Sequence, residues 1–232
     1  MDRLKTQVNE ALSGIQIDFG GGCSASKGYL MAWLIRTRRL TSTVDIGVYR
    51  GRSIVPQAIA HREFTGGKAY GVDPWSKIEA RESGNFALRD AIDKFVDATD
   101  FQAIYEEVRT LIRRLNLEQN CQLVRERSSD AISYFERESI KFGLIHIDGN
   151  HDSDRVEADV ALYLPRLIRG GFVVMDDISW DSVRPAYEAV ANRLYKVYER
   201  LDKWNDYAVF WDAPSSIAAA LLRARLTFVG KG

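Results

Sequence analysis

The sequence predicts an α/β fold in which a mainly parallel, doubly wound sheet of seven strands ends in an antiparallel C-terminal hairpin, with helices on both faces. Five short apolar runs alternate with helical stretches, and they cover residues 43–47, 68–73, 121–125, 142–148 and 172–176. Strands that alternate with helices are typical of a parallel sheet covered on both sides. Two more strand-like runs, 195–201 and 207–211, have too few residues between them for a helix. They should therefore pair as the antiparallel hairpin.

Helical spacing of apolar residues marks several of the connections. The clearest case is the stretch 101–115, where one helical face collects the apolar side chains Phe101, Ile104, Tyr105, Val108, Leu111, Ile112 and Leu115. The stretch 154–167 repeats the pattern, and 28–40 is expected to be a helix that ends in basic residues. A weaker helix is expected over 3–13.

The length of the chain limits the number of domains. The 232 residues suffice for one α/β domain with a full core and are too few for two ordinary domains. We assign residues 28–232 to this single domain and residues 1–27 to an N-terminal lead-in. Gly20, Gly21 and Gly22 interrupt the lead-in without a preceding strand, so we expect a hinge or lid there rather than a phosphate-binding loop.

Charge, apolar runs and cysteine content argue against several classes of partner. The 32 basic and 32 acidic residues give a formal net charge of zero, which lacks the basic footprint expected of nucleic-acid binding. The longest apolar run, 29–35, is far shorter than the ~20 residues of a membrane span, and the first residues contain no apolar signal core. Cys23 and Cys121 do not form a disulfide framework. We therefore expect a cytoplasmic protein that acts on a small molecule, and the sequence leaves a homo-oligomer open.

The first predicted strand leads into a helix through a turn framed by Gly47 and Gly51. Glycine is needed where the backbone turns tightly or approaches a ligand closely. The pattern D-x-G-x-x-x-G differs from the G-x-G-x-x-G fingerprint of dinucleotide-binding proteins. A helix that begins near Arg52 and Ser53 would direct its free N–H groups at a ligand in the turn.

Asp73 ends the second predicted strand, 22 residues after Gly51. In doubly wound nucleotide-binding folds, an acid about 20 residues beyond the glycine turn accepts hydrogen bonds from the ribose hydroxyls. The alternative is a strand-end acid that only forms a turn with Pro74. Trp75 follows, and it could line a ligand pocket or close the edge of the sheet.

The third predicted strand is followed by polar residues that have two possible uses. Ser128 or Asp130 could contact a ligand at this end of the sheet. Capping of the next helix by Ser129 or Asp130 is an equal alternative.

Acidic side chains follow the fourth and fifth predicted strands. Asp148 ends the fourth strand, and Asp176 with Asp177 ends the fifth. Adjacent parallel strands open onto the same crevice, so these carboxylates should converge. Carboxylates held together repel one another unless protons or a cation compensate. Hard divalent cations prefer such oxygen ligands, and the cluster therefore predicts a metal site. The alternative is that these acids cap the following helix or turn.

Two segments carry a family resemblance. H-I-D-G-N-H-D at 146–152 and L-P-R-L-I-R-G-G-F-V-V-M-D-D-I at 164–178 resemble class I S-adenosylmethionine-dependent methyltransferases. The resemblance is to the small Mg²⁺-dependent sugar O-methyltransferases of the macrolide and aminocoumarin type, and it spans roughly 43–180. It implies a Rossmann-like sheet, S-adenosyl-L-methionine as cofactor and Mg²⁺ or Mn²⁺ as metal.

The resemblance also implies site residues. In that family the acid before the glycine turn organises the turn and the amino end of the cofactor, a role that falls on Asp45. The full expected cofactor set is Asp45, Gly47, Tyr49, Gly51, Ser53, Asp73, Ser128 and Asp148. The expected metal ligands are Asp148, Asp176 and Asp177.

Two histidines flank Asp148. The family places a catalytic base at the position of His151, in the loop that should overhang the crevice, and Asp148 is the expected second catalytic residue. A neutral imidazole there could take the proton of an acceptor hydroxyl. His146 lies two residues before Asp148 on the same strand face, and we expect it to be a buried, hydrogen-bonded residue instead.

The sequence thus predicts metal-assisted methyl transfer to a hydroxyl of a small molecule, a sugar or a glycosylated natural product. Methylation of a catechol or another phenol is an alternative, although those enzymes more often pair Asp with Asn after the fifth strand. A non-catalytic cofactor-binding subunit is the other alternative, and the acidic cluster with its histidine argues against it. The macrolide enzymes carry N-terminal architecture that this sequence lacks, so the resemblance does not identify the acceptor.

Overall fold

The computed structural model describes residues 2–18, 22–83, 88–202 and 205–229. Its centre is a seven-stranded sheet with the order β3-β2-β1-β4-β5-β7-β6. The strands are β1 Ser42–Ile46, β2 Lys68–Val72, β3 Cys121–Val124, β4 Phe142–Ile147, β5 Leu167–Asp176, β6 Tyr195–Arg200 and β7 Tyr207–Trp211. Strands β1 to β5 pair in parallel, and β7 lies antiparallel between β5 and β6. The predicted fold class and its hairpin are confirmed.

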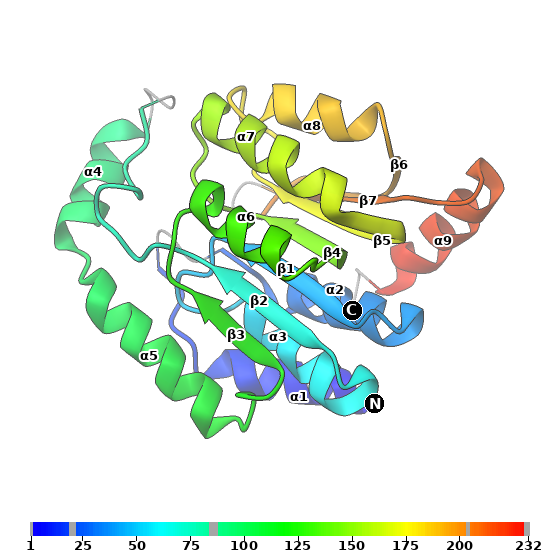
Figure 1. The fold of residues 1–232 in the computed structure, drawn as a ribbon, viewed down its shortest axis with the longest axis horizontal. Coiled ribbons are helices and arrows are strands. Elements are labelled where there is room, and N and C mark those ends of the chain that lie inside the picture. The colour runs from blue at the N-terminus through cyan, green and yellow to red at the C-terminus, as the bar shows by residue number, and fades with distance from the viewer. Residues whose placement is uncertain (1, 19–21, 84–87, 203–204, 230–232) are drawn as a thin grey trace.

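Helices cover both faces of this sheet (Figure 1). Buried side chains form one core cluster on the face covered by α1 Arg3–Ser13, α2 Ala25–Arg38, α3 Ile54–Ala60, α4 Arg89–Ala98, α5 Phe101–Arg114 and α9 Ser216–Val229. A second cluster fills the face covered by α6 Ser128–Arg137, α7 Ser153–Tyr163 and α8 Arg184–Ala191. A π-helical turn, His61–Thr65, extends α3, and a 3₁₀ turn, Leu164–Arg166, follows α7.

Several element boundaries differ from the predicted ones for local reasons. The helix predicted at 28–40 begins at Ala25, because the side chain of Ser24 accepts the backbone N–H of Lys27 and caps it. The helix predicted at 154–167 ends at Tyr163, since Pro165 in the next turn has no N–H to continue it. Strand β5 then begins at Leu167 rather than at residue 172.

The N-terminal lead-in packs into the same core as the rest of the chain. Leu4, Val8 and Leu12 of α1 are buried in the cluster that lines the α2 face of the sheet. Helix α2 crosses the boundary drawn at residue 27. The glycines at 20 and 21, on which the hinge was predicted, lie outside the described residues.

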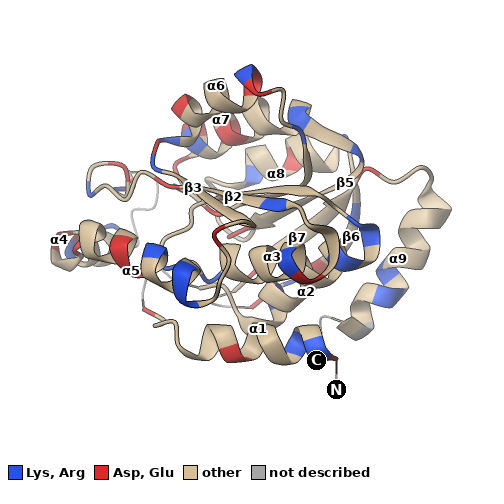
Figure 2. Cartoon of the chain, turned by 60° about the horizontal axis from the view of Figure 1, so that its bottom comes forward, with Lys and Arg blue, Asp and Glu red and all other residues tan. Residues whose placement is uncertain are grey.

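Charges are mixed over the surface. Figure 2 shows basic and acidic positions on helices of both faces rather than one continuous basic face. Among the described residues, no helix has the length and apolar character needed to cross a membrane.

The pleat of the sheet determines which polar residues meet. Val44, Ile46, Ile145 and Ile147 lie in the core on the α6–α8 side. Because side chains alternate along a strand, Asp45 and His146 point to the opposite face, towards α2. The two residues are direct partners in the β1–β4 register. The polar site is therefore built beneath α2, at the carboxyl ends of the central strands.

Candidate active site

The turn after β1 has the backbone shape that its glycines predict. Gly47 has φ of +89°, and a Cβ on it would lie 1.8 Å from the carbonyl oxygen of Asp148. Gly51 has φ of +85°, and its N–H donates to the carbonyl of Val48 at 2.7 Å. Any other side chain at position 47 would push the loop away from the end of β4. The turn therefore lies directly against the residues that follow β4, where the acidic part of the site begins.

Asp73 supports this turn from the end of β2. One carboxylate oxygen accepts the N–H of Tyr49 at 2.9 Å, and the other accepts the N–H of Trp75 at 2.6 Å. Burial raises the pKa of Asp73 to about 6, against the lowering effect of these donors. Each oxygen keeps accepting capacity beyond one hydrogen bond. Asp73 lines the cavity described below and remains free to accept a ribose hydroxyl.

Asp45 does not reach the cavity. It is fully buried, and one oxygen accepts the hydroxyl of Ser53 at 2.7 Å while the other contacts Nδ1 of His146. Its geometry fits the expected organisation of the turn and leaves no path to the amino end of a cofactor. Ser53 lines the cavity, although its hydroxyl donates to Asp45.

The structure of the loop after β3 decides between a ligand contact and helix capping for the residues predicted there. Helix α6 begins at Ser128 without a side-chain cap, so neither Ser129 nor Asp130 caps it. Asp130 instead pairs with Arg127 at 2.7 Å on the surface. Ser128 lines the cavity beside Asp159. Of the residues predicted after β3, Ser128 alone is placed to contact a ligand.

Trp75 has a structural role. It is 3% exposed, its indole N–H donates to the carbonyl of Tyr49 at 2.9 Å, and its ring lies 4.8 Å from that of Tyr105. It packs the glycine turn against α5. Tyr49 itself lines the cavity with φ of +45°, and its hydroxyl donates to Asp18 at 2.9 Å.

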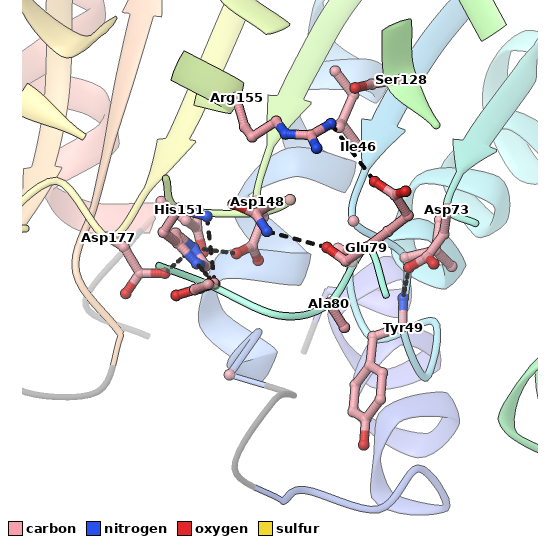
Figure 3. A pocket seen from close by; sticks show the side chains of 18 of the residues that line it. Ile46, Tyr49, Asp73, Glu79, Ala80, Ser128, Asp148, His151, Arg155 and Asp177 are labelled. Atoms are coloured by element: carbon pink, nitrogen blue, oxygen red, sulfur yellow. Dashed lines mark hydrogen bonds and ion pairs between the residues drawn. The ribbon is translucent and has the colours of Figure 1, made fainter. Parts of the chain in front are cut away.

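One cavity of about 350 Å³ joins these elements. It runs from the glycine turn and Asp73 to the acidic residues after β4 and β5. In Figure 3, Tyr49 and Asp73 lie on one side of this space, and Asp148, His151 and Asp177 lie on the other. A ligand that fills the cavity would contact both sides.

His151 and the carboxylates of Asp148 and Asp177 form what we call the outer group. Their ligand atoms lie within 4.8 Å of one another, and all three residues line the cavity. His151 Nε2 is buried, 2.8 Å from Asp177 and 3.9 Å from Asp148, and it makes no well-directed hydrogen bond to any described residue. Its Nδ1 contacts Glu82 at 2.7 Å, and its ring lies 4.8 Å from that of Trp180.

The outer group carries excess negative charge, which shifts two pKa values. Burial opposes a charge on His151, but Asp177 and the other nearby carboxylates hold the pKa of His151 well above its usual value. Burial and the charge of Asp176 raise the pKa of Asp148 to about 6, although Lys27 acts in the opposite direction. A proton or a cation is therefore favoured at this point.

Asp45, His146, Asp176 and Lys27 form a second set, the inner group. The Lys27 ammonium contacts Oδ2 of Asp176, and His146 Nε2 lies 3.2 Å from its Oδ1. The inner group is 8% exposed or less at every side chain. His146 is thus buried and hydrogen-bonded, as predicted.

The inner group is charged and internally neutralised. Burial opposes ionisation of Asp176, but Lys27 and His146 hold its pKa well below the usual range. Burial also opposes a charge on His146, and the carboxylates of Asp45 and Asp176 raise its pKa to about 10. Burial likewise disfavours the Lys27 ammonium, but Asp176 keeps its pKa well above the ordinary value.

The predicted metal triad is not assembled as expected. Among the described residues, two groups have metal-ligand spacing, and Asp148 belongs to both. Asp176 is in one with His146, and Asp177 is in the other with His151. Asp176 and Asp177 separate because strand alternation points Asp176 towards α2, where Lys27 holds it.

Sequence reasoning missed Lys27 and Glu82. Lys27 lies more than a hundred residues from its partners, in the part of the sequence assigned to the lead-in. Its only sequence signal is a lysine two residues before the apolar run that begins at Tyr29. Glu82 comes from the region between β2 and α4, where no element was predicted.

The carboxylate oxygens of the outer group fit a divalent cation. Asp148 and Asp177 are 22% and 29% exposed, so their oxygens are accessible from the cavity. Within the part of the chain that the structure describes, Nε2 of His151 has no well-directed partner, so it can face an acceptor hydroxyl beside such a cation. Asp176 offers less, because both of its oxygens already contact protein cations or donors.

Comparison with known families gives one match. Residues 44–178 match a family described as a methyltransferase domain. The matched region begins in β1 and ends just after Asp177. It therefore contains the glycine turn, Asp73 and every residue of the outer group. No curated protein matches the chain.

Solved structures share the fold at low sequence identity. An O-methyltransferase from Bacillus cereus in complex with SAH has a TM-score of 0.62 and 16% identity, over 91% of this chain and 90% of that one. The O-methyltransferase TomG from Streptomyces achromogenes, involved in tomaymycin synthesis and in complex with SAM, has a TM-score of 0.61, 15% identity and the same coverage. The SAH-bound methyltransferase PaMTH1 of Podospora anserina has a TM-score of 0.56 and 14% identity, over 92% and 89%.

Proposed function

We propose, from the family to which this chain belongs, that it methylates a hydroxyl group of a small molecule with the help of a divalent cation. The chain is a member of the methyltransferase domain family that its residues 44–178 match, and it is a class I S-adenosylmethionine-dependent enzyme. The observation that carries the proposal is the outer group. Asp148, His151 and Asp177 line the same cavity as the glycine turn and Asp73. A methyl donor and an acceptor hydroxyl could therefore meet beside a potential base.

The cofactor would lie along the glycine turn. Asp73 accepts the ribose hydroxyls, since a carboxylate can take both protons. Gly47 and Gly51 let the backbone approach the methionine part, and Ser128 faces the adenine. S-adenosylmethionine supplies an electrophilic methyl group on its sulfonium sulfur.

Asp148 and Asp177 would hold the cation, Mg²⁺ or Mn²⁺. Their accessible oxygens support this assignment, and so does the pKa of Asp148, which burial and the charge of Asp176 raise and which a bound cation would lower again. The set of metal ligands implied by the family resemblance also includes Asp176, which here contacts Lys27 instead. A bound cation polarises the acceptor oxygen and lowers the pKa of its hydroxyl.

His151 is the proposed base. It is fixed on one side by Glu82 and packs against Trp180, with Nε2 directed at the carboxylates of the outer group. In its neutral form Nε2 can accept the proton that leaves the acceptor hydroxyl. Glu82 then stabilises the imidazolium that results.

The acceptor is proposed to be a sugar or a glycosylated natural product. Glu82 and Asn205 line the cavity, and each has a buried side-chain oxygen, Oε2 and Oδ1, that accepts no hydrogen bond from the described residues. Several hydroxyl donors on one molecule would satisfy them, and Trp180 offers an apolar surface for a sugar ring. A catechol brings only two hydroxyls, one of which is the methyl acceptor, so it would leave one of these two atoms unpaired.

An acceptor screen tests the proposal. The purified protein is incubated with S-adenosylmethionine, Mg²⁺ and a panel of sugars, glycosides and catechols, and S-adenosylhomocysteine release is measured. We expect release with a glycoside and O-methylation of its product by mass spectrometry. Turnover with catechols alone would overturn the acceptor class. Cofactor binding without turnover on any panel member would favour a non-catalytic subunit.

A further inference from the structure

Lys27 is placed in the site by the start of α2. Its side chain is 1% exposed, and its backbone N–H is held by the capping hydroxyl of Ser24 at 3.2 Å. The next residue, Gly28, lies so close to α3 that a Cβ on it would be 2.8 Å from Pro56. This close helix packing carries the lysine beneath the ends of β4 and β5.

The ammonium of Lys27 faces two carboxylates. It contacts Oδ2 of Asp176 and lies 3.6 Å from Oδ2 of Asp148. The ring of Tyr207 lies 5.7 Å from it and closes the far side. A cation that bridged Asp148 and Asp176 would occupy the space that this ammonium fills.

We propose that Lys27 is the resident cation of the inner group, and that its ammonium keeps Asp176 out of the coordination of a divalent metal. The metal would then bind at the outer group through Asp148 and Asp177. Lys27 is a positioning residue in this scheme, because it acts through Asp176 and Asp148 and touches neither cofactor nor acceptor. The inference rests on the proposed use of a metal.

Burial explains why the ammonium is not easily replaced. A divalent ion that took over Asp176 would leave Lys27 buried without its main counter-ion, which is strongly unfavourable. The capped start of α2 and its contact with Pro56 restrict movement of the lysine backbone. Asp177 instead faces the imidazole of His151, which, unlike Lys27, can give up its positive charge by releasing a proton.

Binding of Mn²⁺ to the full-length protein tests the inference without any turnover. Affinity is measured by calorimetry and by the electron paramagnetic resonance signal of free Mn²⁺. The variants are Asp176→Asn, Asp177→Asn, Lys27→Met and the double variant Lys27→Met with Asp176→Asn. Lys196→Met, which removes a partly exposed lysine, is the matched control.

The inference predicts a distinct pattern of affinities. Asp177→Asn should weaken Mn²⁺ binding by about tenfold or more, whereas Asp176→Asn should change it by less than about threefold. Lys27→Met should strengthen binding by about tenfold, because it frees Asp176, and the double variant should return to the wild-type value. Lys196→Met should have no effect.

The outcomes separate this inference from the proposed function. If Asp176→Asn weakens binding as much as Asp177→Asn, the inference is wrong while metal use stands. If the wild type binds no Mn²⁺ but Lys27→Met does, Lys27 excludes the metal from the whole site, so metal use by the wild type and metal binding at its outer group are both wrong. If neither binds, both are wrong. If Lys27→Met does not fold and the wild type binds Mn²⁺, the comparison of Asp176→Asn with Asp177→Asn tests the inference. If Lys27→Met does not fold and the wild type binds no Mn²⁺, the inference is wrong.

Discussion

The two halves of the acidic cluster differ in how their charge is balanced. In the inner group, a lysine and a histidine neutralise Asp45 and Asp176, and water has almost no access. In the outer group, one histidine faces several carboxylates, and the cavity reaches all of them. Charge that the protein balances itself stabilises the fold at this point. Charge that it leaves unbalanced is available for a cation, a proton or a substrate.

Removal of the metal should have the largest effect if this division is correct. Chelation with EDTA should abolish methyl transfer, and Mg²⁺ or Mn²⁺ should restore it, because the outer carboxylates then regain their counter-ion. Asp177→Asn should have a similar effect, whereas Asp181→Asn, at a nearby exposed position, should not. Release of S-adenosylhomocysteine measures both. Transfer that survives exhaustive chelation would show that the outer group works without a metal.

Loss of the proposed base should have the next largest effect. His151→Ala should reduce turnover by about 10²-fold or more, since a positioned base typically contributes 10²–10⁴-fold. Binding of S-adenosylhomocysteine should remain nearly unchanged, which serves as the control for folding. Turnover within about threefold of the wild type would assign the proton to solvent or to a carboxylate.

Asp73→Ala tests the cofactor side of the cavity. Loss of charge-assisted hydrogen bonds to the ribose costs about 1.5–3 kcal/mol, or roughly tenfold or more in affinity for S-adenosylhomocysteine. Calorimetry measures the change. Asp130→Ala is the control, because Asp130 lies after the next strand and pairs with Arg127 on the surface. Equal affinities in the two variants would remove Asp73 from the cofactor site.

The pH profile gives a smaller and more specific effect. Only neutral His151 can accept a proton, so activity should rise as pH increases through its pKa. Nearby carboxylates hold that pKa above its usual value, so the rising limb should lie above pH 6.5 at low metal concentration. A saturating cation repels the imidazolium and should move the limb to lower pH. If the pH of the rising limb does not change with metal concentration, His151 does not lie beside the cation site.

His146→Ala should affect turnover least and stability most. The variant leaves Asp45 and Asp176 buried with one partner fewer, and breaking a buried charge pair costs about 3–5 kcal/mol. A shift of about 2–4 °C per kcal/mol is expected for a domain of this size. Thermal unfolding measures it. A stable but inactive variant would show that His146 takes part in catalysis, and it would contradict the division between the inner and outer groups.

The fold could be predicted because its signals are local. The apolar runs of β1, β2 and β4 and the spacing of α5 follow directly from periodicity. Helices α4, α8 and α9 were not predicted. Helix α9 is held by its packing on the sheet edge, with Ala219, Leu222 and Leu226 buried there. Such tertiary contacts leave only a weak trace in a single sequence.

The site could be predicted only in part, because the positions of its carboxylates can be recognised in the sequence and the positions of their counter-ions cannot. Asp148 and Asp177 follow strand ends, which is a positional signal. Lys27 is remote in sequence, and nothing in its neighbourhood shows that it reaches Asp176. The expected metal triad therefore included Asp176, and the contact with Lys27 was found only in three dimensions.

The most direct test of the account is the position of the metal itself. A crystal of the protein with S-adenosylhomocysteine and Mn²⁺ would give an anomalous difference peak for the ion. The account predicts that peak between the carboxylates of Asp148 and Asp177, with Asp176 still paired to Lys27. A peak coordinated by Asp176, with Lys27 displaced from it, would contradict the division between the two halves of the site.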